Sequence, residues 1–120
     1  MEPVIEGTEF GSITIAGKAF PHDVVIRPSG KVKKRKKKLS KAQYGTSHTV
    51  SRDEAEHIYR QGAERVIIGS GQYGRVELSR EARAFFENQG CAVELLPTPE
   101  ALQKWNAAAG KAIAMFHVTC

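Results

Sequence analysis

Alternation of apolar and polar residues in the first third of the chain predicts short β-strands. Residues 12–16 alternate with a period of two, and a Gly-Lys pair after them supplies a turn. Residues 23–27 form a second run, rich in β-branched side chains, which a Pro-Ser-Gly turn closes. We therefore expect these two segments to form an antiparallel hairpin or a small meander.

Helical spacing of apolar residues recurs three times after residue 50, and each time a polar residue marks the start. Ser51 and Glu54 form a capping box, in which the serine hydroxyl accepts the Glu54 amide and the Glu54 carboxylate reaches back to the Ser51 amide. Ser79 caps the second helix, and Thr98, with proline after it, opens the third. Glycines are predicted to end these helices at Gly62, Gly90 and Gly110.

Apolar runs between the helices predict strands at residues 65–68, 91–96 and 112–118. The last run is nearly unbroken, as in a strand that is buried on both faces. The first two should be parallel neighbours, joined by a right-handed crossover. The pattern indicates an α/β fold in a single domain over residues 1–120. We expect a central mixed sheet with helices packed on it and an extra N-terminal antiparallel β element.

The net charge of +5 is concentrated in one tract, residues 31–41, which holds eight of the eighteen basic side chains. The remaining ten basic and thirteen acidic side chains leave the rest of the chain at −3. Residues 31–50 therefore form a basic, polar segment, expected to be a loop or an extended edge of the domain, whose lysines stay solvated. The alternative is that the tract neutralises phosphates of a nucleic acid. The candidate contacts are Lys33, Lys34, Arg35, Lys36, Lys37 and Lys38.

A glycine-rich segment, residues 69–74, follows the strand at 65–68 and has the spacing GxGxxG. With Glu94 twenty residues beyond Gly74, it matches the fingerprint of a dinucleotide site. Such a site also needs a helix that begins at the glycine turn, whereas residues 75–78 are predicted to be extended. We therefore interpret the segment as a turn. A turn at the carboxyl end of a strand still lies where open α/β sheets bind ligands.

His117 lies near the end of the last predicted strand, three residues before Cys120. Side chains at positions 117 and 119 of a regular strand share one face, and those at 118 and 120 share the other. A Cys–His nucleophile pair needs hydrogen-bond contact, so this geometry argues against one. No other catalytic group is apparent in the sequence, and an enzyme is the less favoured interpretation.

Several classes of protein are excluded or disfavoured. No run of 18 apolar residues is present, so we expect no membrane partner. The acidic N-terminal segment has the wrong sign for a secretory signal or a transit peptide. Cys91 and Cys120 have no spacing for zinc and cannot build a disulfide framework. We expect a cytoplasmic protein without a metal or a cofactor.

Several short segments, taken in order, resemble one known family. They are residues 10–13, 23–24, 28–32, 66–71, 97–101 with Trp105 and Asn106, and 116–120. In these segments the chain resembles the small single-domain family that includes the adipogenesis-associated domain-containing protein and the mitochondrial respiratory complex I assembly factor 3. After residue 32 the chain departs from that family, because a lysine run stands where its members carry an aromatic residue and an arginine on a strand.

The resemblance implies a mixed sheet covered by helices, no established catalytic activity, and an assembly role for the mitochondrial members. The family's recurring positions correspond here to Asp23, His48, Gly69, Gly71, Thr98, Asn106, His117 and Cys120. Turns and caps explain the glycines and Thr98, so the remaining polar side chains suggest a pocket. The candidate pocket residues are His48, Gly69, Ser70, Gly71, Asn106 and His117.

Three functions follow as hypotheses. The first is a non-catalytic interaction or assembly module with an unidentified protein partner, which the resemblance favours. The second is a small-ligand-binding protein or an enzyme, with a polar site at the glycine-rich loop 69–74. The third is nucleic-acid binding through residues 31–41, which is possible but not favoured because few aromatic side chains for base stacking lie near the tract.

Overall fold

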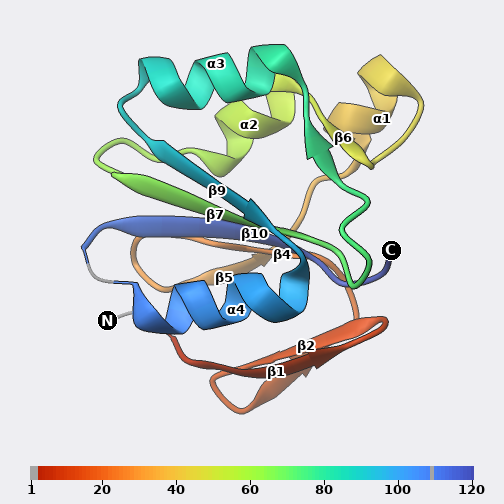
Figure 1. The fold of residues 1–120 in the computed structure, drawn as a ribbon, viewed down its shortest axis with the longest axis vertical. Helices are drawn as coiled ribbons and strands as arrows, with labels where there is room; N and C mark the ends of the chain where they lie inside the picture. The colour runs from red at the N-terminus through yellow and green to blue at the C-terminus, as the bar shows by residue number, and fades with distance from the viewer. Residues whose placement is uncertain (1–2, 109) are drawn as a thin grey trace.

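A mixed five-stranded sheet forms the centre of the computed structural model, which describes residues 3–108 and 110–120 (Figure 1). In spatial order its strands are β5 (Val32–Lys34), β4 (Val24–Ile26), β10 (Ala112–His117), β7 (Arg65–Ser70) and β9 (Ala92–Leu96). Strand β7 lies between β10 and β9 and is parallel to both, as predicted for β7 and β9. Strands β4 and β5 add an antiparallel edge. The predicted fold class is confirmed.

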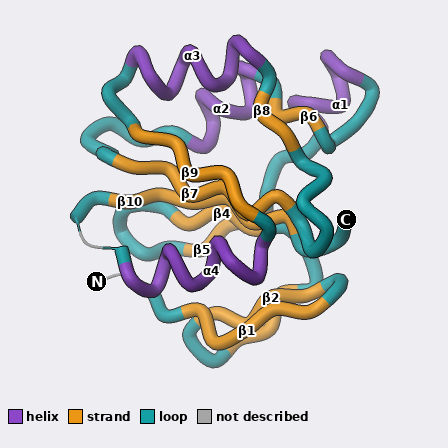
Figure 2. Tube along the Cα trace, in the orientation of Figure 1, coloured by secondary structure: helices purple, strands orange, loops and turns teal. Residues whose placement is uncertain are grey.

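Helices cover both faces of this sheet (Figure 2). Helices α2 (Arg52–Ile58) and α3 (Arg80–Asn88) lie on one face, and α4 (Thr98–Ala107) lies on the other. The residues of β10 are buried along its whole length because side chains on either face enter one of two apolar cores. Within the described residues, no helix has both the length and the apolar character needed to cross a bilayer.

The N-terminal β element is a three-stranded antiparallel sheet of β1 (Ile5–Glu9), β2 (Ser12–Ile15) and β3 (Lys18–Phe20). It packs beside α4, and its buried isoleucines share a core with Trp105. The predicted hairpin between residues 12–16 and 23–27 is wrong, since residues 24–26 form β4 of the central sheet. All three β4 side chains are buried, which requires a sheet with both faces covered.

The basic segment 31–50 is more ordered than a loop. It contains the edge strand β5, helix α1 (Lys38–Tyr44) and β6 (Thr49–Val50), which pairs in parallel with β8 (Glu77–Leu78). Helix α1 was not predicted, because a lysine-rich stretch has no apolar stripe at helical spacing. Gly45 ends α1 in the left-handed conformation, at φ = 71°.

The cap of α2 differs from the predicted capping box in one respect. The Ser51 hydroxyl accepts the Glu54 amide at 3.1 Å, as expected. The reciprocal bond is absent, because the Glu54 carboxylate accepts from Arg35 and from the Ser40 hydroxyl instead. The Ser51 amide donates to the Ser40 oxygen at 2.9 Å. Helix α2 ends at Ile58 rather than at the predicted glycine, since the next residue is already extended.

Candidate functional site

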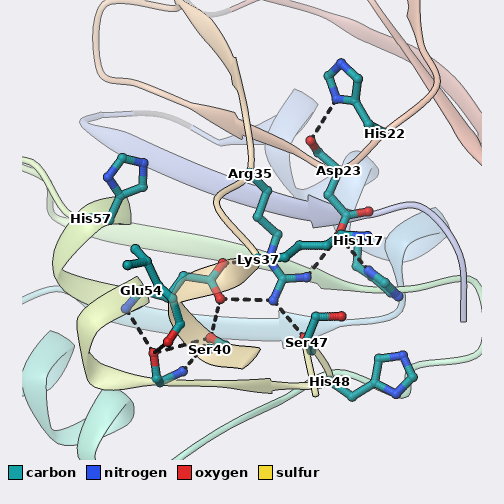
Figure 3. A network of polar contacts seen from close by, with 12 residues as sticks. His22, Asp23, Arg35, Lys37, Ser40, Ser47, His48, Glu54, His57 and His117 are labelled. Atoms are coloured by element: carbon teal, nitrogen blue, oxygen red, sulfur yellow. Dashed lines mark hydrogen bonds and ion pairs between the residues drawn. The ribbon is translucent and has the colours of Figure 1, made fainter. Parts of the chain in front are cut away.

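Arg35 lies at the centre of a buried ionic network, although it belongs to the basic tract (Figure 3). Its Nε lies 2.6 Å from Oε2 of Glu54, and its Nη1 lies 2.9 Å from Oδ2 of Asp23. Nη2 donates to the Ser47 carbonyl at 2.7 Å. Burial acts to lower the pKa of Arg35, but the two carboxylates outweigh it and raise that pKa. Arg35 is 4% exposed, so its assignment as a nucleic-acid contact is wrong.

Asp23 joins this network to the end of β10. Its Oδ1 accepts the Val118 amide at 2.9 Å, and its Oδ2 lies 2.7 Å from Nδ1 of His117. Burial acts to raise the pKa of Asp23, but hydrogen bonds and charge from His117, the Val118 amide and Arg35 hold it well below its usual range. An ionised Asp23 can only accept, so the Nδ1 atom of His117 carries a proton.

The other ring nitrogen of His117 faces a hydroxyl. Nε2 lies 3.1 Å from Oγ1 of Thr119, and the His117 side chain is otherwise enclosed. Thr119 is half-buried and lies two residues beyond the end of β10. Thr119 was not among the predicted pocket residues. The alternation of side chains along a strand could have identified it, because positions 117 and 119 lie on the same face.

Asp23 and Thr119 open onto a cleft of about 710 Å³ between β4, the chain after β5, and the C-terminal segment. The lining residues are Pro21, His22, Asp23, Lys34, Arg35, Lys36, Lys37, Lys38, Val118 and Thr119. Lys37 reaches into it, with Nζ 3.6 Å from Oδ2 of Asp23. The cleft therefore combines lysines on one wall with a carboxylate, a hydroxyl and the Val118 side chain on the other.

The glycine-rich loop is bonded to the C-terminal segment rather than open to a ligand. The Gln72 amide donates to the Thr119 carbonyl at 2.7 Å, and the Tyr73 amide donates to the Cys120 carbonyl at 3.2 Å. The Gly71 amide donates to Oγ1 of Thr98 at 2.9 Å. Helix α3 begins at Arg80, well after the glycines. These amides are engaged and no helix starts at the turn, so the loop does not have the geometry of a dinucleotide fingerprint.

Most of the predicted pocket residues do lie around His117. The His48 ring packs edge-on against the His117 ring, with centroids 5.5 Å apart. A side chain at Gly71, where φ is +105°, would collide with the backbone of Cys120 and with His117. One at Gly69 would approach Oγ1 of Thr98 to 2.8 Å. The two glycines therefore permit close packing. Ser70, between them, is buried at the end of β7.

His48 and Thr98 have distinct roles near His117. Burial lowers the pKa of His48, and interaction with the neighbouring His117 and Arg35 side chains lowers it further. Thr98 is the first residue of α4 and makes no capping bond, contrary to the prediction. Its hydroxyl donates to the His117 carbonyl at 2.6 Å and accepts from the glycine-rich loop. Thr98 therefore fixes the loop to β10.

Asn106 does not join this site. Its Oδ1 accepts the Ile5 amide at 2.9 Å, and its Nδ2 donates to the Ile5 carbonyl at 2.8 Å. Both polar groups of the side chain are thereby used to hold β1 against α4. The candidate pocket thus retains His48, His117 and the loop, and gains Asp23 and Thr119 in place of Asn106.

A second, smaller cleft of about 320 Å³ lies beside the same basic segment. Its lining residues are Arg27, Lys33, Lys34, Lys36, His57 and Arg60. Burial lowers the pKa of Arg27, and the charge of Arg60 lowers it further. Lys33 is exposed, and its pKa is lowered chiefly by the charge of Lys31. Like charges are therefore crowded along β5.

The fold and the buried polar cluster together define the class of protein to which the chain belongs. A mixed sheet with helices on both faces, an N-terminal three-stranded sheet and a buried Asp–His–Arg cluster define a small α/β domain. The chain belongs to the family described as protein of unknown function (DUF498/DUF598), whose model matches residues 5–117. The resemblance to a small family without known biochemical function is thus confirmed.

Solved structures agree with that assignment. The chain is 36% identical to the conserved hypothetical protein PH1505 of Pyrococcus horikoshii OT3, with a TM-score of 0.88 and coverage of 97% of this chain and 98% of that one. It is 33% identical to a structure named MT938, with a TM-score of 0.83 and coverage of 99% and 100%. A Mth938-like domain of Bordetella pertussis, at 15% identity, a TM-score of 0.64 and coverage of 97% and 85%, shares the fold.

The acidic and histidine side chains at the centre of the site bond to one another and to neighbouring polar groups. Across residues 3–108 and 110–120, no group of three or more His, Cys, Asp or Glu side chains is arranged to hold a metal ion. Asp23, His117 and Glu54 are instead bonded to Arg35, to Thr119 or to each other. The site thus has an ionised carboxylate, a hydroxyl and lysines along one cleft, and the enclosed His117 imidazole contacts the first two.

Proposed function

We propose that this protein binds a small anionic ligand in the 710 Å³ cleft beside Asp23 and Thr119. The observation that carries the proposal is the lining of the cleft, in which Lys34, Lys36, Lys37 and Lys38 occur together with Asp23 and Thr119. The volume lies within the range of roughly 300–1,000 Å³ that is typical of small-molecule sites. The sequence predicted a polar ligand site at the glycine-rich loop 69–74. The site proposed here is instead the neighbouring cleft.

The chemistry of the walls indicates what kind of ligand would fit. Lysine ammonium groups attract a carboxylate or a phosphate as point charges. The Asp23 carboxylate can accept a hydrogen bond, the Thr119 hydroxyl can accept or donate one, and Pro21 and Val118 supply apolar contact. A ligand with an anionic end and a less polar body would satisfy both parts of the cleft.

Titration calorimetry with pyrophosphate and with 4-hydroxybenzoate tests this proposal. Replacing Lys37→Gln should weaken binding several-fold, because Lys37 reaches to within 3.6 Å of Asp23. Lys41→Gln is the matched control, since Lys41 lies on α1 and does not line the cleft. Absence of binding by either anion, or an equal loss in both variants, would contradict the proposal.

Nucleic-acid binding is a second candidate, which the smaller basic cleft favours. This cleft and the larger one share Lys34 and Lys36, so the basic surface continues across β5 and is longer than a small ligand requires. Binding to generic duplex and single strands should then fall steeply with salt. The triple change of Lys33, Lys34 and Lys36 to Gln should reduce the salt slope; an unchanged slope would remove this candidate.

An interaction or assembly role, suggested by the family resemblance, finds support in a pair of exposed aromatic rings. Phe10 is 59% exposed and Tyr73 is 71% exposed, and their ring centroids lie 6.1 Å apart. Exposed aromatic side chains are common anchors at protein interfaces. A native pull-down should lose its partners when both are changed to Ser, but not when the exposed Tyr44 is; recovery of no reproducible partner would argue against this role.

A further inference from the structure

We propose that Thr119, His117 and Asp23 form a nucleophile, a base and an orienting carboxylate that accept an acyl group from an ester bound in the cleft. The inference rests on the proposed anion-binding function, since the lysines would hold the charged end of the ester. The three side chains contact one another in that order, at 3.1 Å and 2.7 Å. A hydroxyl bonded to an imidazole, itself oriented by a carboxylate, is the arrangement that activates a nucleophile.

Proton positions in this chain of contacts follow from the charge of Asp23. Because Asp23 accepts the Val118 amide and lies beside Arg35, it remains ionised and accepts a hydrogen bond from Nδ1 of His117. In the tautomer that carries its proton on Nδ1, the lone pair of Nε2 faces Thr119. The Thr119 hydroxyl therefore donates to Nε2, which is the direction needed for His117 to remove its proton.

The backbone of Thr119 is held in place by the glycine-rich loop. The Gln72 amide donates to the carbonyl of Thr119, and the Tyr73 and Arg75 amides donate to the carbonyl of Cys120. Gly71 allows this approach, since any side chain there would overlap the Cys120 backbone. The loop that resembled a dinucleotide fingerprint is thus explained as a support that positions the hydroxyl.

The cleft gives a bound ester access to this hydroxyl while His117 stays enclosed. Thr119 and Asp23 line the cleft, whereas His117 is 1% exposed and lies behind them. Lys37, in the same cleft, supplies positive charge for the oxyanion that forms at the ester carbonyl. Burial lowers the pKa of His48, so the ring packed on His117 adds no competing charge near neutral pH.

The proposed reaction has two balanced steps. In the first, Oγ1 of Thr119 bonds to the ester carbonyl carbon while its proton passes to Nε2 of His117. The carbon–oxygen bond to the alcohol then breaks, and the alcohol leaves with that proton, so that the acyl group is attached to Thr119 as an ester. In the second, His117 takes a proton from water, the hydroxide oxygen attacks the acyl carbon, and Thr119 recovers its proton as the acid leaves.

The test uses 4-acetoxy-3-nitrobenzoate, which carries a carboxylate, and 2-nitrophenyl acetate, which has a similar leaving group without one. Both release a coloured nitrophenolate, and the protein carries Cys120→Ala so that this thiol cannot be acylated. We expect the anionic ester to react faster and to leave an acetyl group on Thr119, identified by peptide mass spectrometry. Hydroxylamine should remove it, because it cleaves an ester but not an acetyl-lysine amide.

Two variants at one position separate catalysis from structure. Thr119→Val should slow the release of nitrophenolate roughly 100-fold or more, with little change in thermal unfolding, whereas Thr119→Ser should retain the reaction. Acetylation of lysines alone, or an unchanged rate in Thr119→Val, would overturn the inference. Binding of 4-hydroxy-3-nitrobenzoate, followed by calorimetry, identifies which idea has failed: if it binds and no acetyl-threonine forms, the nucleophile is wrong and the anion site stands.

Discussion

At the scale of single residues, Arg35 has the largest structural consequence. It is enclosed between Asp23 and Glu54, and each of these carboxylates is itself buried (Figure 3). Removing charges from water is expensive, and the network is stable because each charge has a partner and further hydrogen bonds. Glu54 accepts from Ser40 as well as from Arg35, and Asp23 also accepts from the Val118 amide. The network therefore fixes α1, α2, β4 and the end of β10 relative to one another.

Arg35→Met should destabilise the protein strongly. The substitution keeps an unbranched chain of similar length but leaves two buried carboxylates without their shared cation. The expected loss is about 3–5 kcal/mol in the free energy of unfolding, measured by urea denaturation. Lys34→Met on the exposed neighbouring position is the control and should change that free energy by less than about 0.5 kcal/mol. A loss below about 1 kcal/mol in Arg35→Met would contradict a structural role for the network.

At the scale of elements, Asn106 connects two parts of the fold that are distant in the sequence. Its side chain makes the paired hydrogen bonds of a strand neighbour to the backbone of Ile5. Trp105, beside it on α4, donates from its indole nitrogen to the Pro3 carbonyl at 2.8 Å. Helix α4 thus holds the first strand of the N-terminal sheet through polar contacts as well as through the apolar core.

Asn106→Ala should loosen the N-terminal sheet before the rest of the molecule. Both bonds to Ile5 are lost, and the expected decrease in the free energy of unfolding is about 1–3 kcal/mol. Hydrogen exchange should show faster exchange of amides in β1 and β2, with those of β7 and β10 unchanged. Gln103→Ala, an exposed position on the same helix, should leave exchange unaltered. Equal acceleration in all four strands would contradict this role.

The elements that could be predicted are those with a strong local pattern. The buried strands β7, β9 and β10, and helices α2, α3 and α4, follow from apolar spacing and from their flanking polar or turn residues. Helix α1 could not be predicted, because its lysine-rich sequence lacks an apolar stripe and Ser40 is held by contacts from α2. The pairing of β4 was also missed, since local pattern does not determine which strand is the neighbour.

The site was predictable in part for the same reason. His48, His117 and the glycines were identified, and they do lie together. Thr98 and Glu54 occupy positions where helices are usually capped, yet their side chains form tertiary contacts with β10 and with Arg35. Helix capping already accounts for a polar residue at each of these two positions. The sequence therefore gives no separate sign of their tertiary contacts. Arg35 was misassigned because a buried cation cannot be distinguished from its solvated neighbours by sequence position.

At the scale of the whole molecule, charge is divided between an interior network and an exposed edge. The basic tract that dominates the net charge of +5 lies along β5 and its extension, with one residue turned inward to neutralise buried carboxylates. Five of its lysines line the two clefts, and the smaller cleft also includes Arg27 and Arg60; these lysines are Lys33, Lys34, Lys36, Lys37 and Lys38. A single stretch of sequence therefore contributes a buried charge to the network through Arg35 and supplies the lysines of the proposed anion site.

The stability of the molecule should fall on the acid side in two stages. The pKa values of His48 and His57 are lowered in the folded state, chiefly by burial, so unfolding takes up protons once the pH falls below the ordinary value of 6.5. The pKa of Asp23 is lowered below its ordinary value of 3.8 in the folded state. Below pH 3.8, Asp23 is therefore protonated in the unfolded chain but remains ionised in the folded protein. The free energy of unfolding therefore decreases further there.

Urea denaturation between pH 7 and pH 2 measures both stages. Below pH 3.8, the slope that Asp23 contributes to the free energy of unfolding against pH should approach about 1.4 kcal/mol per pH unit. This is the slope for the uptake of one proton on unfolding. Asp23→Asn should be less stable at neutral pH and should lack that part of the slope, whereas Asp53→Asn, on the exposed first turn of α2, should keep it. If the two variants lost the same slope, acid unfolding would reflect the general protonation of carboxylates rather than the network. A slope that disappears with Asp23 alone would show that one buried carboxylate, bonded to both Arg35 and His117, couples the charge of the proposed site to the stability of the whole fold.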